Sequence, residues 1–205
     1  MPIVSEEYKE KKKRALLQAA RRVFIRKGYS LATMQDIIEE AKVSRGALYA
    51  YFTSIEHVYV ELLRAEDQQD LQFFEQTKTN SSWEQLLQWI DEQRMKLSIR
   101  EGTLVRANSE FFLAVQDTAG SASSSYILQR YERIIAVLTA FIEAGRSTGE
   151  FYPILPTDTI AHSFLSFMDG ILLNSSQHGA NTIKAQEQVE ALIAAMKALL
   201  CPVTA

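Results

Sequence analysis

The chain is poor in cysteine, proline and glycine: its 205 residues include one cysteine, four prolines and eight glycines. The single cysteine, Cys201, excludes an intrachain disulfide, which is typical of proteins in a reducing cytoplasm. Few helix-breaking residues and no strand-like alternation of apolar side chains predict an all-α fold. Because Cys201 lies near an apolar helical end, we expect a buried or half-buried thiol and not a redox sensor.

Long hydrophobic runs are also missing. No apolar stretch approaches the roughly 18 uninterrupted residues that a membrane span needs. The first 14 residues contain three glutamates, four lysines and one arginine, which is too charged for the apolar core of a signal peptide. We therefore expect a cytoplasmic protein without membrane contact.

The charge is unevenly distributed along the chain. Residues 1–55 contain 11 Lys and Arg against six Asp and Glu, a net charge of +5, whereas residues 56–205 contain 11 against 19, a net charge of −8. A basic head on an acidic body favours contact between the head and phosphate. A basic stretch is also typical of an ordinary solvated helix face, so the charge supports a nucleic-acid partner without establishing one.

Capping signals and apolar spacing predict a series of helices. Gly28 is a typical residue to end the first helix, and Thr33 with Asp36 and Thr53 with Glu56 form capping-box pairs. The Ser-rich segment 120–125 predicts a loop. We expect helices over residues 6–27, 33–41, 45–52, from 53 onward, 83–97, 104–115, 127–145, 157–176 and 183–200.

Two short helices separated by a turn, at 33–41 and 45–52, are typical of a helix-turn-helix DNA-binding motif. Leu48 and Phe52, four residues apart, would point into the core of this head. The side chains left for DNA are Arg45, Gly46, Ala47, Tyr49 and Tyr51, together with Thr33, Lys42 and Ser44 at the helix ends and the turn.

The chemistry of these side chains suits a duplex. Arg45 can donate two hydrogen bonds to guanine or pair with a phosphate, and small residues at 46 and 47 let the helix lie deep in the groove. The hydroxyls of Tyr49 and Tyr51 suit phosphate oxygens. The alternative is a generic helical subdomain with surface tyrosines, and two exposed aromatics on so short a helix favour the DNA-binding interpretation.

The same residues resemble a known family. They are Phe24, Gly28, Tyr29, Thr33, Ile37, Ala41, the run from Val43 to Tyr49, Tyr51, Phe52, Ser54 and Glu56. This pattern resembles the DNA-binding domain of TetR/AcrR transcriptional regulators. The resemblance implies a three-helix head (residues 1–53) on a six-helix regulatory and dimerisation body (residues 54–205). It also implies a homodimer that represses transcription from a pseudo-palindromic operator and is released by a small molecule.

The chain departs from the family pattern at two positions. Lys42 stands in the turn where glycine is usual, so we expect a lysine with positive φ, at a strain of about 1 kcal/mol. Ile55 stands at the start of the fourth helix, where the family often has a lysine that touches phosphate. Lys42 or the basic segment 11–14 are candidates to replace that contact.

The resemblance also implies that the last two helices pair with their symmetry mates. Residues that suit such an interface are Phe167, Gly170, Ile171, Leu192 and Met196. A glycine inside a helix is unfavourable unless another backbone approaches it closely, which a helix–helix interface provides. The alternative is that these faces serve only the core of the single chain.

Large side chains in the middle of the chain predict a small-molecule pocket, which suits an apolar or aromatic effector. The candidate lining residues are Phe73, Trp89, Asn108, Phe112, Tyr131, Phe164 and Met168. The alternative is that each aromatic at helical spacing simply belongs to the core.

Catalytic chemistry has little support. His57, His162 and His178 are far apart in sequence and no two of them stand four residues apart, so we expect no metal site, no cofactor and no enzyme. Two alternatives to a ligand-responsive regulator remain open. One is an architectural DNA-binding protein without an effector, and the other is an all-α enzyme.

Overall fold

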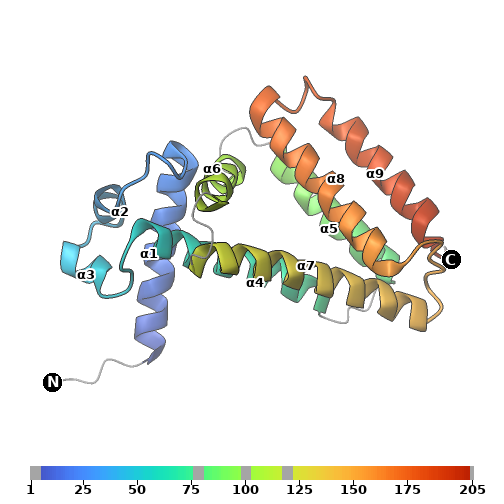
Figure 1. Ribbon diagram of the computed structural model, residues 1–205, viewed down its shortest axis with the longest axis horizontal. Coiled ribbons are helices and arrows are strands. Elements are labelled where there is room, and N and C mark those ends of the chain that lie inside the picture. The colour runs from blue at the N-terminus through green and yellow to red at the C-terminus, as the bar shows by residue number, and fades with distance from the viewer. Residues whose placement is uncertain (1–5, 76–80, 98–102, 117–121, 204–205) are drawn as a thin grey trace. The chain divides into compact units, whose positions relative to one another are not determined.

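A computed structural model describes residues 6–75, 81–97, 103–116 and 122–203, and all regular secondary structure within these ranges is helical. The all-α prediction is confirmed (Figure 1). No helix of the described ranges is long and apolar enough to cross a membrane. The helices are α1 (Glu6–Lys27), α2 (Met34–Ala41), α3 (Arg45–Tyr49), α4 (Ile55–Glu75), α5 (Ser82–Leu97), α6 (Val105–Gln116), α7 (Ala122–Ser147), α8 (Thr157–His178) and α9 (Ala185–Leu200).

The chain divides into two compact units. The first contains residues 1–67 and 101–126, and the second contains residues 68–100 and 127–205. Helix α6 therefore groups with the helices of the head, although the sequence assigns it to the body. The predicted boundary between residues 53 and 54 stays a prediction.

In the first unit, α1 packs its apolar face against α2 and α6. An aromatic cluster joins α1, α4 and α6: the Phe24 ring lies 4.7 Å from the Tyr59 ring, which lies 4.7 Å from the Phe111 ring. All three side chains are at most 1% exposed. Burial of three aromatic rings contributes several kcal/mol, so this cluster is the main apolar support of the head.

Helix α6 is also held by polar contacts to the loop after α1. The Glu110 carboxylate accepts a hydrogen bond from the Ser30 backbone N–H at 2.9 Å and pairs with Arg106 at 2.7 Å. Gly28 ends α1 with φ 76°, as its position in the sequence predicts. A Cβ at Gly28 would lie 2.5 Å from a Glu110 oxygen, so the close approach of α6 requires glycine there.

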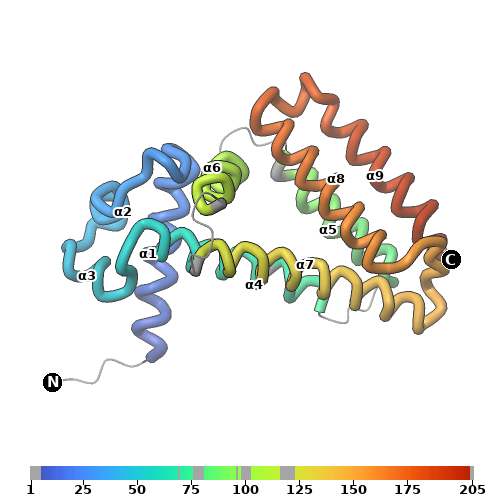
Figure 2. The backbone as a smooth tube through the Cα atoms, viewed as in Figure 1, coloured from blue at the N-terminus to red at the C-terminus, as the bar shows by residue number. Residues whose placement is uncertain are grey.

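In the second unit, α5, α8 and α9 pack together around a largely apolar core. The rings of Phe74 and Phe141 lie 5.1 Å apart, and those of Trp89 and Phe164 lie 5.5 Å apart. Figure 2 shows α8 and α9 running in opposite directions from the turn that joins them. The Tyr152 N–H donates to the Leu200 carbonyl at 2.8 Å, which ties the loop before α8 to the end of α9.

Two sequence predictions about local structure are wrong. Residues 122–125 form the first turn of α7 and not a loop, because serines tolerate a helix when the following residues continue its apolar face; residues 120–121 lie outside the described ranges. Cys201 is exposed and not buried. It ends α9 in the left-handed region with φ 44°, and its thiol donates to the Ala198 carbonyl at 3.3 Å at an exposed position.

Candidate nucleic-acid interface

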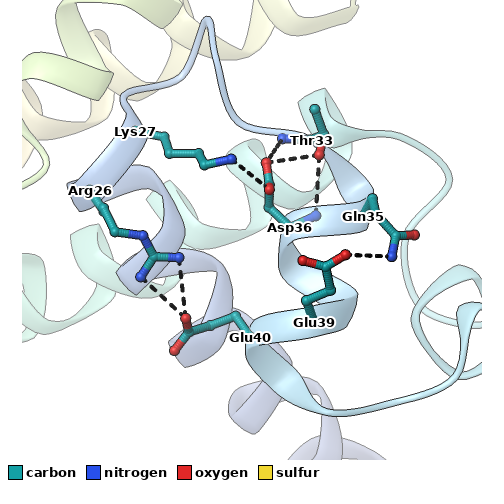
Figure 3. A network of polar contacts seen from close by, with 7 residues as sticks. All are labelled: Arg26, Lys27, Thr33, Gln35, Asp36, Glu39 and Glu40. Carbon is teal, nitrogen blue, oxygen red and sulfur yellow. Dashed lines mark hydrogen bonds and ion pairs between the residues drawn. The ribbon is translucent and has the colours of Figure 1, made fainter.

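The first helix of the predicted motif, α2, begins with the capping box that the sequence predicts. The Thr33 Oγ1 accepts from the Asp36 N–H at 3.2 Å, and the Asp36 carboxylate accepts from the Thr33 N–H at 3.0 Å and from its hydroxyl at 2.8 Å. Lys27 pairs with Asp36 at 2.6 Å, and its hydrogen bond holds the pKa of that carboxyl below the ordinary 3.8 (Figure 3). The Thr33 hydroxyl is therefore occupied in both directions by its own helix.

Helix α2 is also tied to α1 along its length. Glu40 accepts from Arg22 at 2.6 Å and from Arg26 at 3.3 Å, and Figure 3 shows the Arg26 contact. The hydrogen bond from Arg22, followed by that from Arg26, holds the pKa of Glu40 below the ordinary 4.5. These two arginines thus bridge α1 to Glu40 of α2 at an exposed position.

The turn after α2 has the strain that the sequence predicts. Lys42 lies in the left-handed region with φ 52° and ψ 47°, and its N–H caps the carbonyls of Ile38 and Glu39. Its side chain is exposed. The turn that glycine usually makes is therefore made by a lysine, which adds a cation next to α3.

Helix α3 separates a core face from an exposed face. Leu48 and the following Phe52 are both 0% exposed, as predicted. Ser44 caps α3, because its Oγ accepts from the Ala47 N–H at 3.3 Å. The N-cap hydroxyl thereby fixes the first turn of a helix only five residues long.

The exposed face of α3 carries the predicted reading residues. The Arg45 guanidinium lies over the Tyr49 ring, 5.2 Å from its centroid, and Tyr49 is 41% exposed. Gly46 is exposed, and a Cβ there would meet nothing within 4 Å. Ala47 and Tyr51 are half-buried at the edges of this face. The structure thus brings Arg45, Gly46 and Tyr49 together on one accessible surface.

Two details of this region differ from the prediction. Helix α3 ends at Tyr49 and not near Phe52, since Ala50 and Tyr51 form a turn in which the Tyr51 N–H bonds the Leu48 carbonyl at 3.0 Å. Helix α4 is capped by Ser54, whose Oγ accepts from the His57 N–H at 3.1 Å. The ring of His57 then accepts from the Thr53 N–H at 3.2 Å, a role in the head that sequence spacing does not reveal.

The cations of the first unit fall into two groups. One group pairs with carboxylates of the chain: Lys9, Lys13, Arg21, Arg22, Arg26, Lys27, Arg64 and Arg106. The other has no carboxylate partner within the described ranges: Lys11, Lys12, Arg14, Lys42 and Arg45. The second group is confined to the beginning of α1, the turn and α3. Pairing therefore separates the cations that a carboxylate of the chain already holds from those that none of the described carboxylates holds.

The predicted pocket residues are divided between the two units. Phe73, Trp89, Tyr131, Phe164 and Met168 belong to the second unit, where Phe164 and Met168 are 2% and 1% exposed in the core. The Trp89 Nε1 is buried with no hydrogen-bond partner in the described part of the chain. The Tyr131 hydroxyl lies 2.7 Å from the His162 Nδ1 at an exposed position.

Asn108 and Phe112 lie on α6 in the first unit. The Asn108 Oδ1 accepts from the Tyr59 hydroxyl at 2.6 Å, so this amide supports the aromatic cluster of the head. A surface hollow of about 430 Å³ lies along α5, and its described lining includes none of the predicted pocket residues. The lining consists of Glu84, Leu87, Gln88, Asp91, Glu92 and Met95.

The predicted interface residues differ in accessibility. Phe167 is 41% exposed, and a Cβ on Gly170 would meet nothing within 4 Å. Ile171, Leu192 and Met196 are at most 2% exposed and belong to the core of their own unit. The apolar pattern identified these three as packing residues but could not tell which side of each helix the same chain covers. Helix α9, which packs against α8, presents four exposed alanines: Ala191, Ala194, Ala195 and Ala198.

Comparisons with known proteins agree with this architecture. Residues 16–62 match the sequence pattern of "Bacterial regulatory proteins, tetR family", and residues 85–186 match "Tetracyclin repressor-like, C-terminal domain". The HTH-type transcriptional regulator YfiR of Bacillus subtilis is 31% identical over 175 residues, which cover 85% of this chain and 84% of that protein. The HTH-type transcriptional repressor AcnR of Corynebacterium diphtheriae is 34% identical over 64 residues, 31% of this chain and 34% of AcnR.

Solved structures share the fold at low sequence identity. Reduced Escherichia coli NemR superposes with a TM-score of 0.76 at 19% identity, covering 95% of this chain and 100% of that one. The SmeT–triclosan complex superposes with a TM-score of 0.72 at 16% identity, covering 94% and 96%. With both sequence patterns matched and a relative aligned over most of both chains, this chain belongs to the TetR family of DNA-binding transcriptional regulators.

Proposed function

We propose that the protein is a sequence-specific repressor that reads a pseudo-palindromic operator through α3 and is released by a small, largely apolar or aromatic effector. The observation that carries the proposal is the exposed face of α3, where Arg45 and Tyr49 have no carboxylate partner among the described residues. An unpaired arginine on a short exposed helix suits direct readout of guanine in the major groove.

The residues around α3 divide into reading and positioning roles. Arg45 reads a base edge, and Gly46 and Ala47 keep the helix surface low enough for it to enter the groove. Tyr49 and Tyr51 contact phosphate oxygens or thymine methyls. The two rings differ in accessibility, since Tyr49 is exposed and Tyr51 is half-buried.

Residues at the helix ends position the backbone. Ser44 uses only its Oγ lone pair on the Ala47 N–H, so its hydroxyl proton is available to a phosphate oxygen. Lys42 brings a charge to the same end of α3. Thr33 contributes less through its hydroxyl, which the Asp36 carboxylate already receives; its place in the proposal is at the amino end of α2, where the free amides favour an anion.

We propose a homodimer built on the exposed sides of α8 and α9. Phe167 offers an apolar anchor, while Gly170 and the four exposed alanines of α9 allow a second pair of helices to approach closely. Ile171, Leu192 and Met196 support this surface from inside the unit. Two heads about 34 Å apart on the DNA would read the two halves of a palindrome.

The effector site is proposed within the helical body. The buried Nε1 of Trp89 is a hydrogen-bond donor that a ligand acceptor could satisfy, and the neighbouring Phe164 ring, 5.5 Å away, suits an aromatic ligand. Phe73, Tyr131 and Met168 in the same unit complete the proposed lining, whereas Asn108 and Phe112 belong to the other unit and are left out of it. The structural relative SmeT has been solved with triclosan, which supports a small-molecule effector for this chain.

Three measurements on the full chain test the proposal. Selection from random double-stranded DNA should enrich a pseudo-palindrome, and light scattering should give about twice the chain mass of 23.2 kDa. Screening compounds against the protein–DNA complex should then identify molecules that release it. A monomer at micromolar concentration with and without DNA, or enrichment of no motif, would contradict the proposal; an operator that no compound releases would favour an architectural protein.

A further inference from the structure

The first turns of α1 carry basic side chains on two opposite faces. At 100° per residue, Lys9, Lys12 and Lys13 share the face that continues as Leu16 and Leu17, which are 1% and 8% exposed against the core of the head. On the other side of the same turns lie Lys11 and Arg14, both exposed. We call the face of Lys9, Lys12 and Lys13 the inner face of these turns and the face of Lys11 and Arg14 the outer face.

Two ion pairs show how α1 runs along α4. Arg21 pairs with Glu66 at 3.1 Å, and two turns earlier Lys13 pairs with Glu61 at 2.6 Å. Moving toward the start of α1 thus moves toward the start of α4. One further turn back, Lys9 continues this course toward the start of α4 and the segment that precedes it, which begins with Ala50 and Tyr51.

Electrostatics agrees with this placement. The pKa of Lys9 is raised, chiefly by its hydrogen bond to Glu6 and that carboxylate's charge, and in smaller part by Tyr51. Tyr51 is therefore near enough to act on the Lys9 ammonium. Figure 1 shows the first turns of α1 extending past the helices with which α1 packs.

The inner-face lysines are available to a polyanion. Lys12 has no carboxylate partner within the described ranges. Among the carboxylates that the structure describes, Lys9 pairs with Glu6 alone, one turn away on the same helix, at an exposed position. Exposed pairs of this kind contribute about 0–1 kcal/mol, so exchange of Glu6 for a phosphate is inexpensive. Ile55, at the start of α4, offers no cation in this region.

We propose that Lys9 and Lys12 bind the DNA phosphate backbone beside the groove that α3 enters, so that the first turns of α1 form a second DNA contact of each head. Lys13 holds this segment in place through Glu61 and is a positioning residue. Lys11 and Arg14 face away and make no such contact. The inference rests on the proposed function, and it locates a phosphate contact on α1 that the predicted helix-turn-helix residues do not include.

The test compares two double variants with equal loss of charge. Lys9→Gln/Lys12→Gln removes the proposed contacts, and Lys11→Gln/Arg14→Gln is the matched control. Affinity of the full chain for its selected DNA is measured by fluorescence anisotropy between about 50 and 200 mM salt. Each lost phosphate contact lowers the slope of log K against log salt by about 0.9, so the first variant should lose about 1.8 per head and at least tenfold in affinity at about 0.1 M salt.

The control should keep a wild-type slope and lose affinity less than threefold. Equal losses of affinity in the two variants would show that the effect comes from overall positive charge, which would overturn the proposed contact. Unchanged affinity in the Lys9→Gln/Lys12→Gln variant would overturn it as well. Both variants must unfold at the wild-type temperature within about 2 °C, and if the double variant does not, Lys12→Gln alone is compared with Lys11→Gln. Failure of the wild-type chain to bind any selected DNA would instead overturn the proposed function.

Discussion

Helices α2 and α3 follow one another in the chain and are built alike, but their polar side chains make different contacts. Both are short, and each is capped by a hydroxyl, from Thr33 and Ser44. The carboxylates of α2 pair with Lys27, Arg22 and Arg26 of α1. The arginine of α3 lies over its own Tyr49 ring and pairs with no carboxylate in the described part of the chain. One helix is bound into the protein, while the other presents its polar groups outward, which is the division of labour expected of a motif in which one helix positions and the other reads.

The largest effect is expected when the arginine of α3 is replaced by alanine and compared with the same replacement of an arginine that pairs with α2. Arg45→Ala should weaken binding to selected DNA by about 1–3 kcal/mol and relax discrimination at one base pair, with unfolding unchanged. Arg22→Ala should leave base discrimination as it is, because that side chain binds Glu40. Anisotropy on the operator and on single-base variants measures both; wild-type selectivity in Arg45→Ala would refute the reading role.

A smaller effect is expected at the cap of α2. Thr33→Ala removes an N-cap hydroxyl and should lower the free energy of unfolding by about 1 kcal/mol, measured by urea denaturation. Thr33→Ser retains the hydroxyl and should stay within about 0.5 kcal/mol of wild type. If alanine and serine behave alike, the capping hydrogen bonds to Asp36 do not stabilise the head.

Gly46 should separate stability from binding. Because a Cβ there meets nothing within 4 Å, Gly46→Ala should stabilise the chain by about 0.5–1 kcal/mol through its helix propensity. The same methyl group would lie on the face that enters the groove, so DNA affinity should fall. Ala50→Gly, just beyond α3, is a control that alters flexibility without adding bulk. A gain in both stability and affinity would place Gly46 outside the interface.

The smallest effect is a pH dependence that arises on α2. The pKa of Asp36 is lowered, first by the hydrogen bond from Lys27, so its contribution to stability is present above the ordinary value of 3.8 and is lost as pH falls through the lower folded-state pKa. The free energy of unfolding should therefore decline below about pH 4, and less so in Asp36→Asn. An identical decline in that variant would assign the acid sensitivity to other carboxylates.

The head could be predicted from sequence largely because its signals are local. The pairing of Thr33 with Asp36 and the burial of Leu48 and Phe52 each follow from spacing within a few residues. The left-handed Lys42 was expected because the family that the chain resembles usually has glycine at that position. The premature end of α3 and the His57 contact could not be predicted, since they depend on how the next helix begins.

Partners from distant elements were harder to predict. Nothing local indicates that Arg22 and Arg26 meet Glu40, or that Ile171, Leu192 and Met196 are covered by their own chain. The family resemblance supplied the fold and the regulatory class. The effector site stays a proposal because aromatic side chains at helical spacing look the same in a core and in a pocket.

The meeting of Gly28 with Glu110 has a consequence for how relatives of this chain can diverge. Two separate restrictions disfavour any residue other than glycine at position 28. One is its φ of 76°, and the other is the Glu110 carboxylate that a Cβ would meet. A shorter residue at 110 would remove only the second restriction and would leave the Ser30 amide without its acceptor. The two positions therefore form a coupled pair, and a substitution at either is expected to be inherited together with a change in the loop that follows α1.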